Sequence, residues 1–291
     1  MLIQYLQSNP GIFLFACLLL GLMLGSFINV VAHRLPIMME RDWRKECLEF
    51  LEQKPQGEGE SQRLGLSKPR SRCPKCGHQI TALENIPVLS YLFLRGRCSD
   101  CRGPISLRYP IVEAFTGVAS LLVAWHFGVS WQTAAALPLT WSLIALSLID
   151  YDHKLLPDSI VLPGLWAGLL LSLSGVFTDA HSSIIGAVAG YLVLWGIFQL
   201  FKLITGKEGM GYGDFKLLAL FGAWFGWQYL VQIVLLSSLV GAIVGVSLIL
   251  FLGRDRQIPI PFGPYLAAAG WISMLWGEQI NSLYLTWAGL T

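Results

Sequence analysis

Long apolar runs dominate the chain, and they restrict it to the architecture of a membrane protein. Hydrophobic residues make up 54% of the 291 residues and charged residues only 13%, whereas about a quarter of the residues of an ordinary soluble domain are charged. A helix needs about 20 residues to cross the hydrocarbon core, and most of the runs are long enough. An all-α polytopic membrane protein with about eight transmembrane helices is therefore predicted. The eight runs are 10–31, 109–128, 131–149, 159–177, 183–203, 215–227, 229–252 and 261–288.

The positive charges predict how these helices are oriented. Fourteen of the 20 Lys and Arg residues lie between Arg34 and Arg108, and if every run crosses the membrane, all 20 fall on one side. The positive-inside rule makes that side the cytoplasm. The run 215–227 is short enough to be re-entrant, but a re-entrant loop would place Arg254 and Arg256 on the other side, so a full span is favoured. Because no basic residue precedes the first run, we expect an uncleaved helix with its N-terminus outside.

Two Cys-x2-Cys pairs stand in the basic segment 34–108, and four thiolates at this spacing are typical of a closed, structural zinc site. Two disulfides are the alternative, which the predicted cytoplasmic, reducing location disfavours. A site with four thiolate ligands leaves no position for water, so its role is to fold the loop and not to catalyse. His78 is only a substitute ligand. The predicted zinc ligands are Cys73, Cys76, Cys98 and Cys101.

Alternate glycines lead into a carboxylate, Asp214, at the start of the short run 215–227. A carboxylate at a membrane segment is costly unless it is paired, solvated or protonated, and it is therefore a functional candidate. The glycines allow another backbone to approach, so a substrate strand can lie there. Gly211, Gly213 and Lys216 are predicted to support this site. The alternative is an ordinary acid in the first turn of a helix, which does not exclude catalysis.

The partner predicted for Asp214 is Asp150, which ends the apolar run 131–149. Two acids at the edges of hydrophobic segments are the minimum set for an aspartic protease, in which like charges share one proton. One carboxylate then acts as a base on water while the other acts as an acid. Asp152 is the main rival for the second catalytic position, although on a continuing helix it faces a different direction.

Four smaller features carry weaker predictions. Gly25, Ser26 and Asn29 suit close helix packing in lipid, and Glu113 is expected to hydrogen bond within the helix packing. The apolar segment 83–94 between the cysteine pairs is either the core of the loop or a segment resting on the membrane surface. The break at 259–265, with three prolines and a glycine, is either a simple turn or exposed backbone that pairs with a substrate.

Together these motifs resemble the bifunctional type IV prepilin peptidases of bacterial inner membranes, which carry the Gly-x-Gly-Asp signature of a family of membrane aspartic proteases. The resemblance runs from residue 25 nearly to the C-terminus. Its elements are Gly-Ser-Phe-Ile-Asn-Val at 25–30, the double Cys-x2-Cys, Ile-Asp-x-Asp-x-x-Leu-Leu-Pro-Asp at 149–158, Gly-Met-Gly-Tyr-Gly-Asp-Phe-Lys at 209–216 and Pro-Phe-Gly-Pro-Tyr at 261–265.

The resemblance implies an activity and a division of the chain. Its essential aspartates correspond to Asp150 and Asp214, and its substrates are type IV prepilins and type II secretion pseudopilins, whose short basic leader is cleaved at the cytoplasmic face. It also implies methylation of the new N-terminus by S-adenosyl-L-methionine. We expect a first transmembrane helix at 1–33, a cytoplasmic zinc module contributing to methyl transfer at 34–108 and a membrane-embedded peptidase at 109–291. Membrane lipid is a further partner, and nucleic acid is not.

Three other functions fit part of the pattern. A cation-coupled transporter also places paired acids in membrane helices, but it gives no reason for a zinc module. A presenilin-like protease of other membrane substrates shares the Gly-x-Gly-Asp signature but not the basic cysteine loop. A non-enzymatic assembly factor would not need Asp214. A nucleotide-binding loop at 209–213 is rejected because no strand precedes the glycines.

Overall fold

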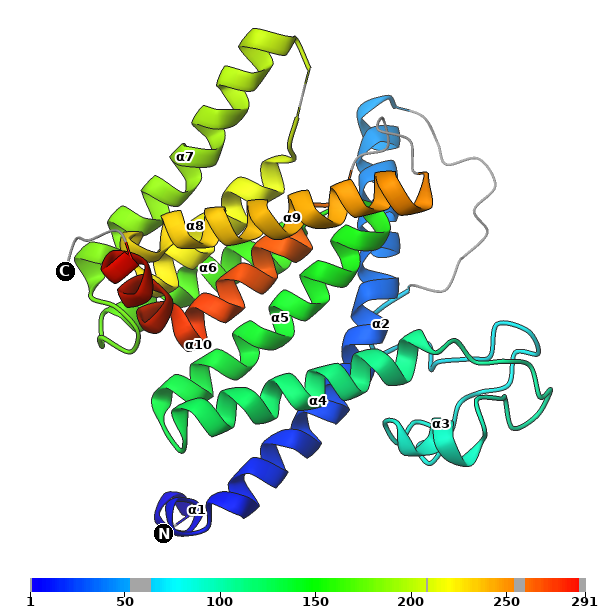
Figure 1. The fold of residues 1–291 in the computed structure, drawn as a ribbon. Helices are drawn as coiled ribbons and strands as arrows, with labels where there is room; N and C mark the ends of the chain where they lie inside the picture. Colours follow the sequence, from blue (N-terminus) through cyan, green and yellow to red (C-terminus); the bar gives the residue numbers. More distant parts are fainter. Residues whose placement is uncertain (1, 53–63, 208, 254–259, 288–291) are drawn as a thin grey trace. The chain divides into compact units, whose positions relative to one another are not determined.

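The structure, a computed structural model, describes residues 2–52, 64–207, 209–253 and 260–287. Within these ranges the chain is helical, and its β structure is limited to two isolated bridges, Arg72 with Gln79 and Arg97 with Pro104, so the predicted all-α class is confirmed. The chain divides into two compact units, residues 1–129 and 130–291, drawn in Figure 1. The first unit holds α1 (Leu2–Ser8), α2 (Pro10–Phe50), α3 (Leu89–Phe93) and α4 (Arg108–Phe127). The second holds α5 (Trp131–His153), α6 (Asp158–Ser172), α7 (Ala180–Thr205), α8 (Tyr212–Phe225), the 3-10 turn η1 (Trp227–Tyr229), α9 (Leu230–Leu252) and α10 (Gly263–Trp287).

Among the described residues, five stretches of helix are long and apolar enough to cross a membrane: α2, α4, α5, α7 and the stretch Trp227–Phe251 that contains α9. The helices α6 and α8 have 15 and 14 residues, which at about 1.5 Å per residue is less than the roughly 30 Å of a hydrocarbon core. Helix α10 is interrupted by non-helical backbone angles at Trp276. A multi-pass membrane protein follows from the five long stretches, whereas the count of eight spans stays a prediction. The connection that carries Arg254 and Arg256 lies outside the described residues.

Helix α2 is longer than the sequence pattern suggested. The first transmembrane helix was predicted at 1–33, from an apolar run that ends at residue 31, but α2 continues without a break for 41 residues and contains Pro36. The helix therefore extends beyond the predicted bound. The residues after Pro36 are mostly strong helix formers, such as Met, Glu, Arg, Lys and Leu, so the helix continues after it leaves the apolar run.

Small residues allow α2 and α4 to pack closely in the first unit. A side chain at Gly25 would lie 2.7 Å from the Glu113 Cα atom, and one at Gly21 would overlap the Ser120 side chain. Asn29, buried beside them, donates hydrogen bonds from Nδ2 to the carbonyl oxygens of Gly25 and Tyr109 at 3.2 and 3.3 Å. The predicted packing role of Gly25 and Asn29 is confirmed, since small residues and interhelical hydrogen bonds replace the hydrophobic effect between helices in lipid.

In the second unit the short helix α8 lies at the centre, packed against α6, α7 and α10 (Figure 1). Eleven of its 14 residues are buried. Gly222 of α8 and Gly186 of α7 bring their backbones into direct contact, with no room for a side chain at either position. Two hydrogen bonds add to this packing: Ser183 Oγ donates to the Ala223 carbonyl oxygen at 2.6 Å, and Trp224 Nε1 donates to the Gly164 carbonyl oxygen at 2.8 Å.

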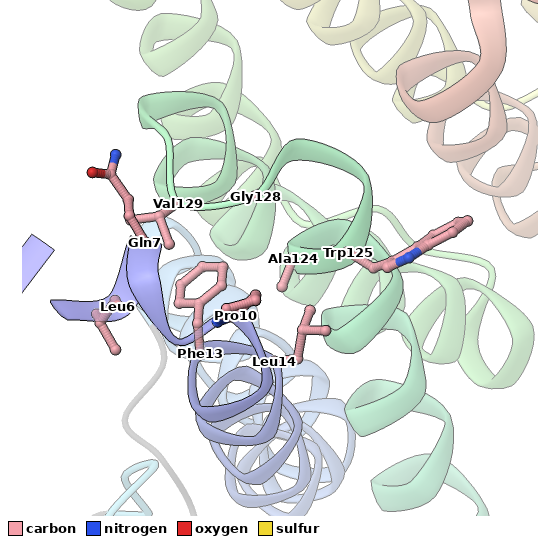
Figure 2. A pocket seen from close by; sticks show the side chains of 9 residues that line it. All are labelled: Leu6, Gln7, Pro10, Phe13, Leu14, Ala124, Trp125, Gly128 and Val129. Carbon is pink, nitrogen blue, oxygen red and sulfur yellow. The ribbon is translucent and has the colours of Figure 1, made fainter. Parts of the chain in front are cut away.

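An apolar pocket of about 340 Å³ lies in the first unit, where the start of α2 meets the end of α4. Figure 2 shows the Phe13 and Leu14 side chains of α2 in this pocket beside Ala124 of α4. None of the lining side chains is titratable, so the pocket offers no acid or base for catalysis. Its lining consists of Leu6, Gln7, Pro10, Phe13, Leu14, Ala124, Trp125, Gly128 and Val129.

Candidate active site

Asp150 lies in the last turn of α5 and is buried, with 6% of its surface exposed. The helix ends three residues later because Lys154 adopts a left-handed conformation, with φ 57° and ψ 38°, and its N–H closes the last turn on the Asp150 carbonyl oxygen at 2.9 Å. The Asp150 carboxylate accepts a hydrogen bond from the backbone N–H of Gly263 at 3.0 Å. A side chain at Gly263 would lie 2.7 Å from Asp150 Oδ2, so only glycine leaves this contact undisturbed.

Asp214 is the third residue of α8 and is also 6% exposed. Gly211 caps the helix in an extended conformation, and its backbone N–H donates to the Asp214 carboxylate. This is the position at which an acid reaches back to the cap residue and benefits from the helix dipole. Asp214 is therefore a first-turn acid, as the alternative prediction had it. That role is compatible with catalysis because its carboxylate also faces a second one.

The structure brings Asp150 and Asp214 together. Their carboxylates are close enough for the negative charge of one to act on the other, although α5 and α8 are separated by two helices in the sequence. Leu156, buried in the loop after α5, fills the space beside them: a side chain at Gly213 would lie 2.8 Å from its Cβ atom, and one at Gly263 would lie 3.2 Å from its Cδ2 atom. Leu156 thus packs against the glycine before Asp214 and the glycine that bonds to Asp150.

The remaining residues of the predicted site take different places. Asp152, the rival acid, is exposed on the last turn of α5, whereas Asp150 is buried. Lys216 Nζ forms an ion pair with both oxygens of Asp158, at 2.8 and 2.7 Å, and so ties the start of α8 to the start of α6. Gly211, the cap of α8, and Gly213, its second residue, both lie just before Asp214.

Two contacts of this site were not predicted from the sequence. The break around Gly263 was interpreted as a simple turn or as backbone that pairs with a substrate, and Asp158 was noted only as the last residue of the motif at 149–158. Proline and glycine signal a turn, but they do not say which side chain the freed backbone N–H will meet. The signal that was available is the glycine itself, because a glycine at a helix start often marks a close approach of another group.

The four predicted zinc ligands come together in the first unit. Their sulfur atoms all lie within 4.8 Å of one another, with Cys73 and Cys101 3.8 Å apart and Cys76 and Cys98 4.0 Å apart. The two Cys-x2-Cys turns form equivalent backbone hydrogen bonds. The N–H of Cys73 donates to the His78 carbonyl oxygen and that of Cys98 to the Gly103 carbonyl oxygen, each at 2.9 Å. The cluster can therefore hold one metal ion between two matching turns.

Glu84 connects the two cysteine turns. Its carboxylate accepts hydrogen bonds from the Ser99 hydroxyl, which follows Cys98, and from the N–H and hydroxyl of Thr81, both at 2.8 Å. His78, two residues after Cys76, lies 3.3 Å from the same carboxylate. The Ser99 hydroxyl and the Thr81 groups lower the pKa of Glu84 to about 2. His78 thus contacts Glu84 beside the cysteine cluster and is not one of the four clustered residues.

Glu113, predicted to hydrogen bond within the helix packing, links α4 to the loop. It is 8% exposed, and its Oε2 accepts a hydrogen bond from the backbone N–H of Val88 at 2.7 Å, while Ser26 of α2 bonds to the same carboxylate. The contact with Ser26 confirms that Glu113 forms a hydrogen bond within the helix packing. The loop contact was not foreseen, since residues 88 and 113 are separated by the whole second cysteine turn.

Comparison with known proteins gives the family. Residues 19–127 match the bacterial peptidase A24 N-terminal domain, and residues 137–246 match the type IV leader peptidase family. Proteins from Stutzerimonas stutzeri and Pseudomonas aeruginosa, both named prepilin leader peptidase/N-methyltransferase, are each 56% identical over 288 residues and are covered, like this chain, to 99%. One of the same name from Dichelobacter nodosus is 48% identical over 283 residues, 97% of each chain.

No solved structure gives a significant match to the chain. The two family matches lie on either side of the boundary between the two compact units, residues 129 and 130. The first contains the four-cysteine cluster and the second contains both buried aspartates. The resemblance inferred from the motifs is confirmed over the full length, and the chain belongs to the prepilin leader peptidase/N-methyltransferase family.

Proposed function

We propose that this protein cleaves the leader peptide of type IV prepilins and type II secretion pseudopilins, with Asp150 and Asp214 as its catalytic pair. The observation that carries the proposal is the meeting of two buried carboxylates, from α5 and α8, inside the second unit. Burying two like charges side by side is costly, and sharing one proton relieves the repulsion. A pair with one proton is the state that an aspartic protease uses.

The pair supplies both proton transfers of peptide hydrolysis. The ionised carboxylate takes a proton from a water molecule, whose oxygen attacks the carbonyl carbon of the scissile peptide bond. The protonated carboxylate donates its proton to the carbonyl oxygen, which gives a neutral tetrahedral intermediate. When the C–N bond breaks, the leaving nitrogen takes a proton from the pair and the hydroxyl proton returns to it, so that the pair again holds one proton.

The contacts of the two carboxylates suggest which is which. Asp150 accepts the Gly263 N–H at 3.0 Å and lies near the positive charge of Lys154. Both favour the ionised form of a carboxylate. We assign Asp150 as the base that takes the proton from water and Asp214 as the acid. Gly211 leaves space beside the Asp214 carboxylate, whereas Leu156 occupies the space at Gly213. Lys216 holds the start of α8 against α6 through Asp158.

The second activity is methylation of the N-terminal amine that cleavage produces. S-adenosyl-L-methionine supplies the methyl group when it is bound. We assign the cysteine module at 34–108 a contribution to this step and the region 109–291 the peptidase, of which residues 130–291 carry both aspartates. The two activities then use separate residues.

The four cysteines fit a zinc ion. In a tetrahedral site with Zn–S bonds of about 2.3 Å, the sulfur atoms lie roughly 3.8 Å apart. The pairs at 3.8 and 4.0 Å match this spacing. A closed set of four thiolates folds the module, and Glu84 joins the two turns beside it.

For the topology, we propose a multi-pass protein of the bacterial inner membrane with the basic segments in the cytoplasm and the N-terminus in the periplasm. Asp150 then ends a helix that runs inward, and Asp214 begins one that runs outward, so the pair lies at the cytoplasmic face. A leader that is basic and cytoplasmic meets the site there. Cysteine-scanning with a membrane-impermeant thiol reagent tests this arrangement.

The direct test of the proposal is a cleavage assay. The purified protein, in lipid nanodiscs, is mixed with a purified prepilin, and mass spectrometry of the products locates the cut. We expect one cut at the leader boundary, and methylation of the new N-terminus when S-adenosyl-L-methionine is added. Intact substrate after prolonged incubation with folded protein would favour the transporter or the assembly factor.

The Asp214→Asn variant is expected to separate the two activities. Because methyl transfer does not need the carboxylate pair, this variant should still methylate a synthetic peptide that already has the mature N-terminus, at close to the wild-type rate. The measurement is transfer of label from S-adenosyl-L-methionine to that peptide. Loss of both activities in a folded variant would instead indicate one shared site.

The cysteine cluster is expected to bind about one zinc ion per chain, which elemental analysis of the purified, reduced protein measures. Cys98→Ser removes one of four ligands and should lower the metal content severalfold, whereas Cys47→Ser, at an exposed free cysteine of α2, should leave it unchanged. Active, reduced protein without any metal would refute the assignment.

A further inference from the structure

The short helix α3, which lies between the two cysteine turns, has an unusually apolar exposed surface. Leu89, Leu92 and Phe93 are 52%, 63% and 84% exposed, and Leu83, shortly before the helix, is 77% exposed. No residue of α3 is buried. The segment is therefore not the core of the loop, which leaves the second of the two predicted roles, contact with the membrane.

A hydrogen bond ties the start of α3 to α4, one of the helices long enough to cross a membrane. The N–H of Val88, the residue before α3, donates to Glu113 Oε2 at 2.7 Å. Glu113 is five residues after Arg108, the exposed cation that begins α4, so it lies only about 7.5 Å further along the helix. Arginine at the end of a membrane helix marks the interface. The start of α3 is thus held at the level of the boundary between headgroups and acyl chains.

The backbone conformation of Val88 exposes the N–H that bonds to Glu113. Val88 has φ 60°, a conformation that is costly for a β-branched residue. Glu113 receives the N–H that this turn exposes, in a helix pair that is itself closely packed through Gly25. The hydrogen bond to Glu113 therefore holds the start of α3 beside α4.

Positive charge follows the apolar residues directly. Arg95 and Arg97 are exposed, and so is Arg102 in the second cysteine turn. Apolar side chains beside a cluster of basic residues are the composition of segments that lie in the interface of a bilayer with anionic lipids. The leucines and Phe93 suit the acyl boundary, and the arginines suit lipid phosphates.

We propose that α3 is an interfacial anchor: Leu89, Leu92 and Phe93 enter the acyl boundary of an anionic bilayer, and Arg95 and Arg97 bind the headgroup phosphates. The partner is the lipid surface itself. This inference does not depend on the peptidase assignment, because it concerns the first unit alone. The second cysteine pair begins at Cys98, five residues after Phe93. The proposal therefore places the four-cysteine cluster at the membrane surface.

The test measures where position 93 lies. The full-length protein carries trifluoromethyl-phenylalanine in place of Phe93, in nanodiscs with anionic lipid, and its fluorine signal is followed with a nitroxide on the lipid acyl chain or with a water-soluble gadolinium chelate. The matched control is the same label at Phe50, which is 88% exposed near the far end of α2. We expect the lipid nitroxide to broaden the signal at 93 severalfold more than the chelate does, and the reverse at 50.

Two further experiments test the roles of Glu113 and of the lipid phosphates. Glu113→Ala should reduce the effect of the lipid nitroxide at position 93, whereas Glu113→Gln, which keeps an acceptor oxygen, should preserve it. Replacing anionic by zwitterionic lipid should also reduce it. Broadening at 93 by the chelate alone would overturn the proposal in favour of a solvated loop. Protection from both probes would overturn it in favour of burial against the second unit or a second copy, and equal effects in both lipids would refute the phosphate contacts.

Discussion

The Asp214→Asn variant is expected to cleave prepilin at least about 10³-fold more slowly than the wild type, and so is Asp150→Asn. The reason is that each change removes one of two carboxylates that must exchange protons during hydrolysis, and proton transfer by a positioned group contributes about 10² to 10⁴ in rate. An asparagine has nearly the same shape, so both variants should remain folded. Leader cleavage by purified protein in nanodiscs measures the effect, with thermal unfolding as the check on folding.

The matched control is Asp152→Asn. Asp152 is on the same turn of α5 as Asp150 but is exposed, and we expect its variant to keep most of the wild-type rate. If the Asp152 variant were inactive while the Asp150 variant cleaved normally, the catalytic partner of Asp214 would be Asp152 and the assignment of Asp150 would be wrong. Full activity of Asp214→Asn would remove the aspartic mechanism altogether.

The second large effect is expected for Gly263→Ala. The added methyl group would lie 2.7 Å from Asp150 Oδ2 and 3.1 Å from its Cγ atom, so the carboxylate has to move and its bond to the Gly263 N–H is disturbed. A displacement of about 1 Å in a catalytic group can cost 10²-fold in rate. We therefore expect kcat for leader cleavage to fall by about 10²-fold with a much smaller change in KM.

Gly196→Ala provides the comparison for that experiment. Gly196 is in α7 of the same unit and has no atom within 4 Å of where a side chain would be placed. Alanine inside a helix is more favourable than glycine by about 1 kcal/mol, so this variant should be as active as the wild type and no less stable. An unchanged kcat in Gly263→Ala would mean that the backbone contact does not position Asp150. A fall in kcat together with a rise in KM and a lowered unfolding temperature would indicate a general packing defect.

Much of the site was predictable because it depends on local rules. Asp150 and Asp214 border apolar runs, where a carboxylate is conspicuous, and the cysteines carry their own spacing. The packing of Gly25 and Asn29 follows from their residue types in a lipid environment.

The rest depends on contacts between distant residues. The bond from Gly263 to Asp150 joins residues 113 positions apart, and the bond from Val88 to Glu113 crosses the cysteine turn; no periodicity encodes either. The first helix was predicted too short because hydropathy marks where lipid ends, not where helix-forming residues end. Hydropathy does not give the number of spans for a related reason: α8 is enclosed by protein in its own unit, so its length need not match the bilayer.

Leu156 gives the two acids a common neighbour. Its side chain lies close to where a side chain would begin at Gly213, the residue before Asp214, and at Gly263, which bonds to Asp150. The absence of a side chain at both glycines therefore leaves room for the same apolar residue. A change at Leu156 reaches the surroundings of both acids, although this residue can neither donate nor accept a proton.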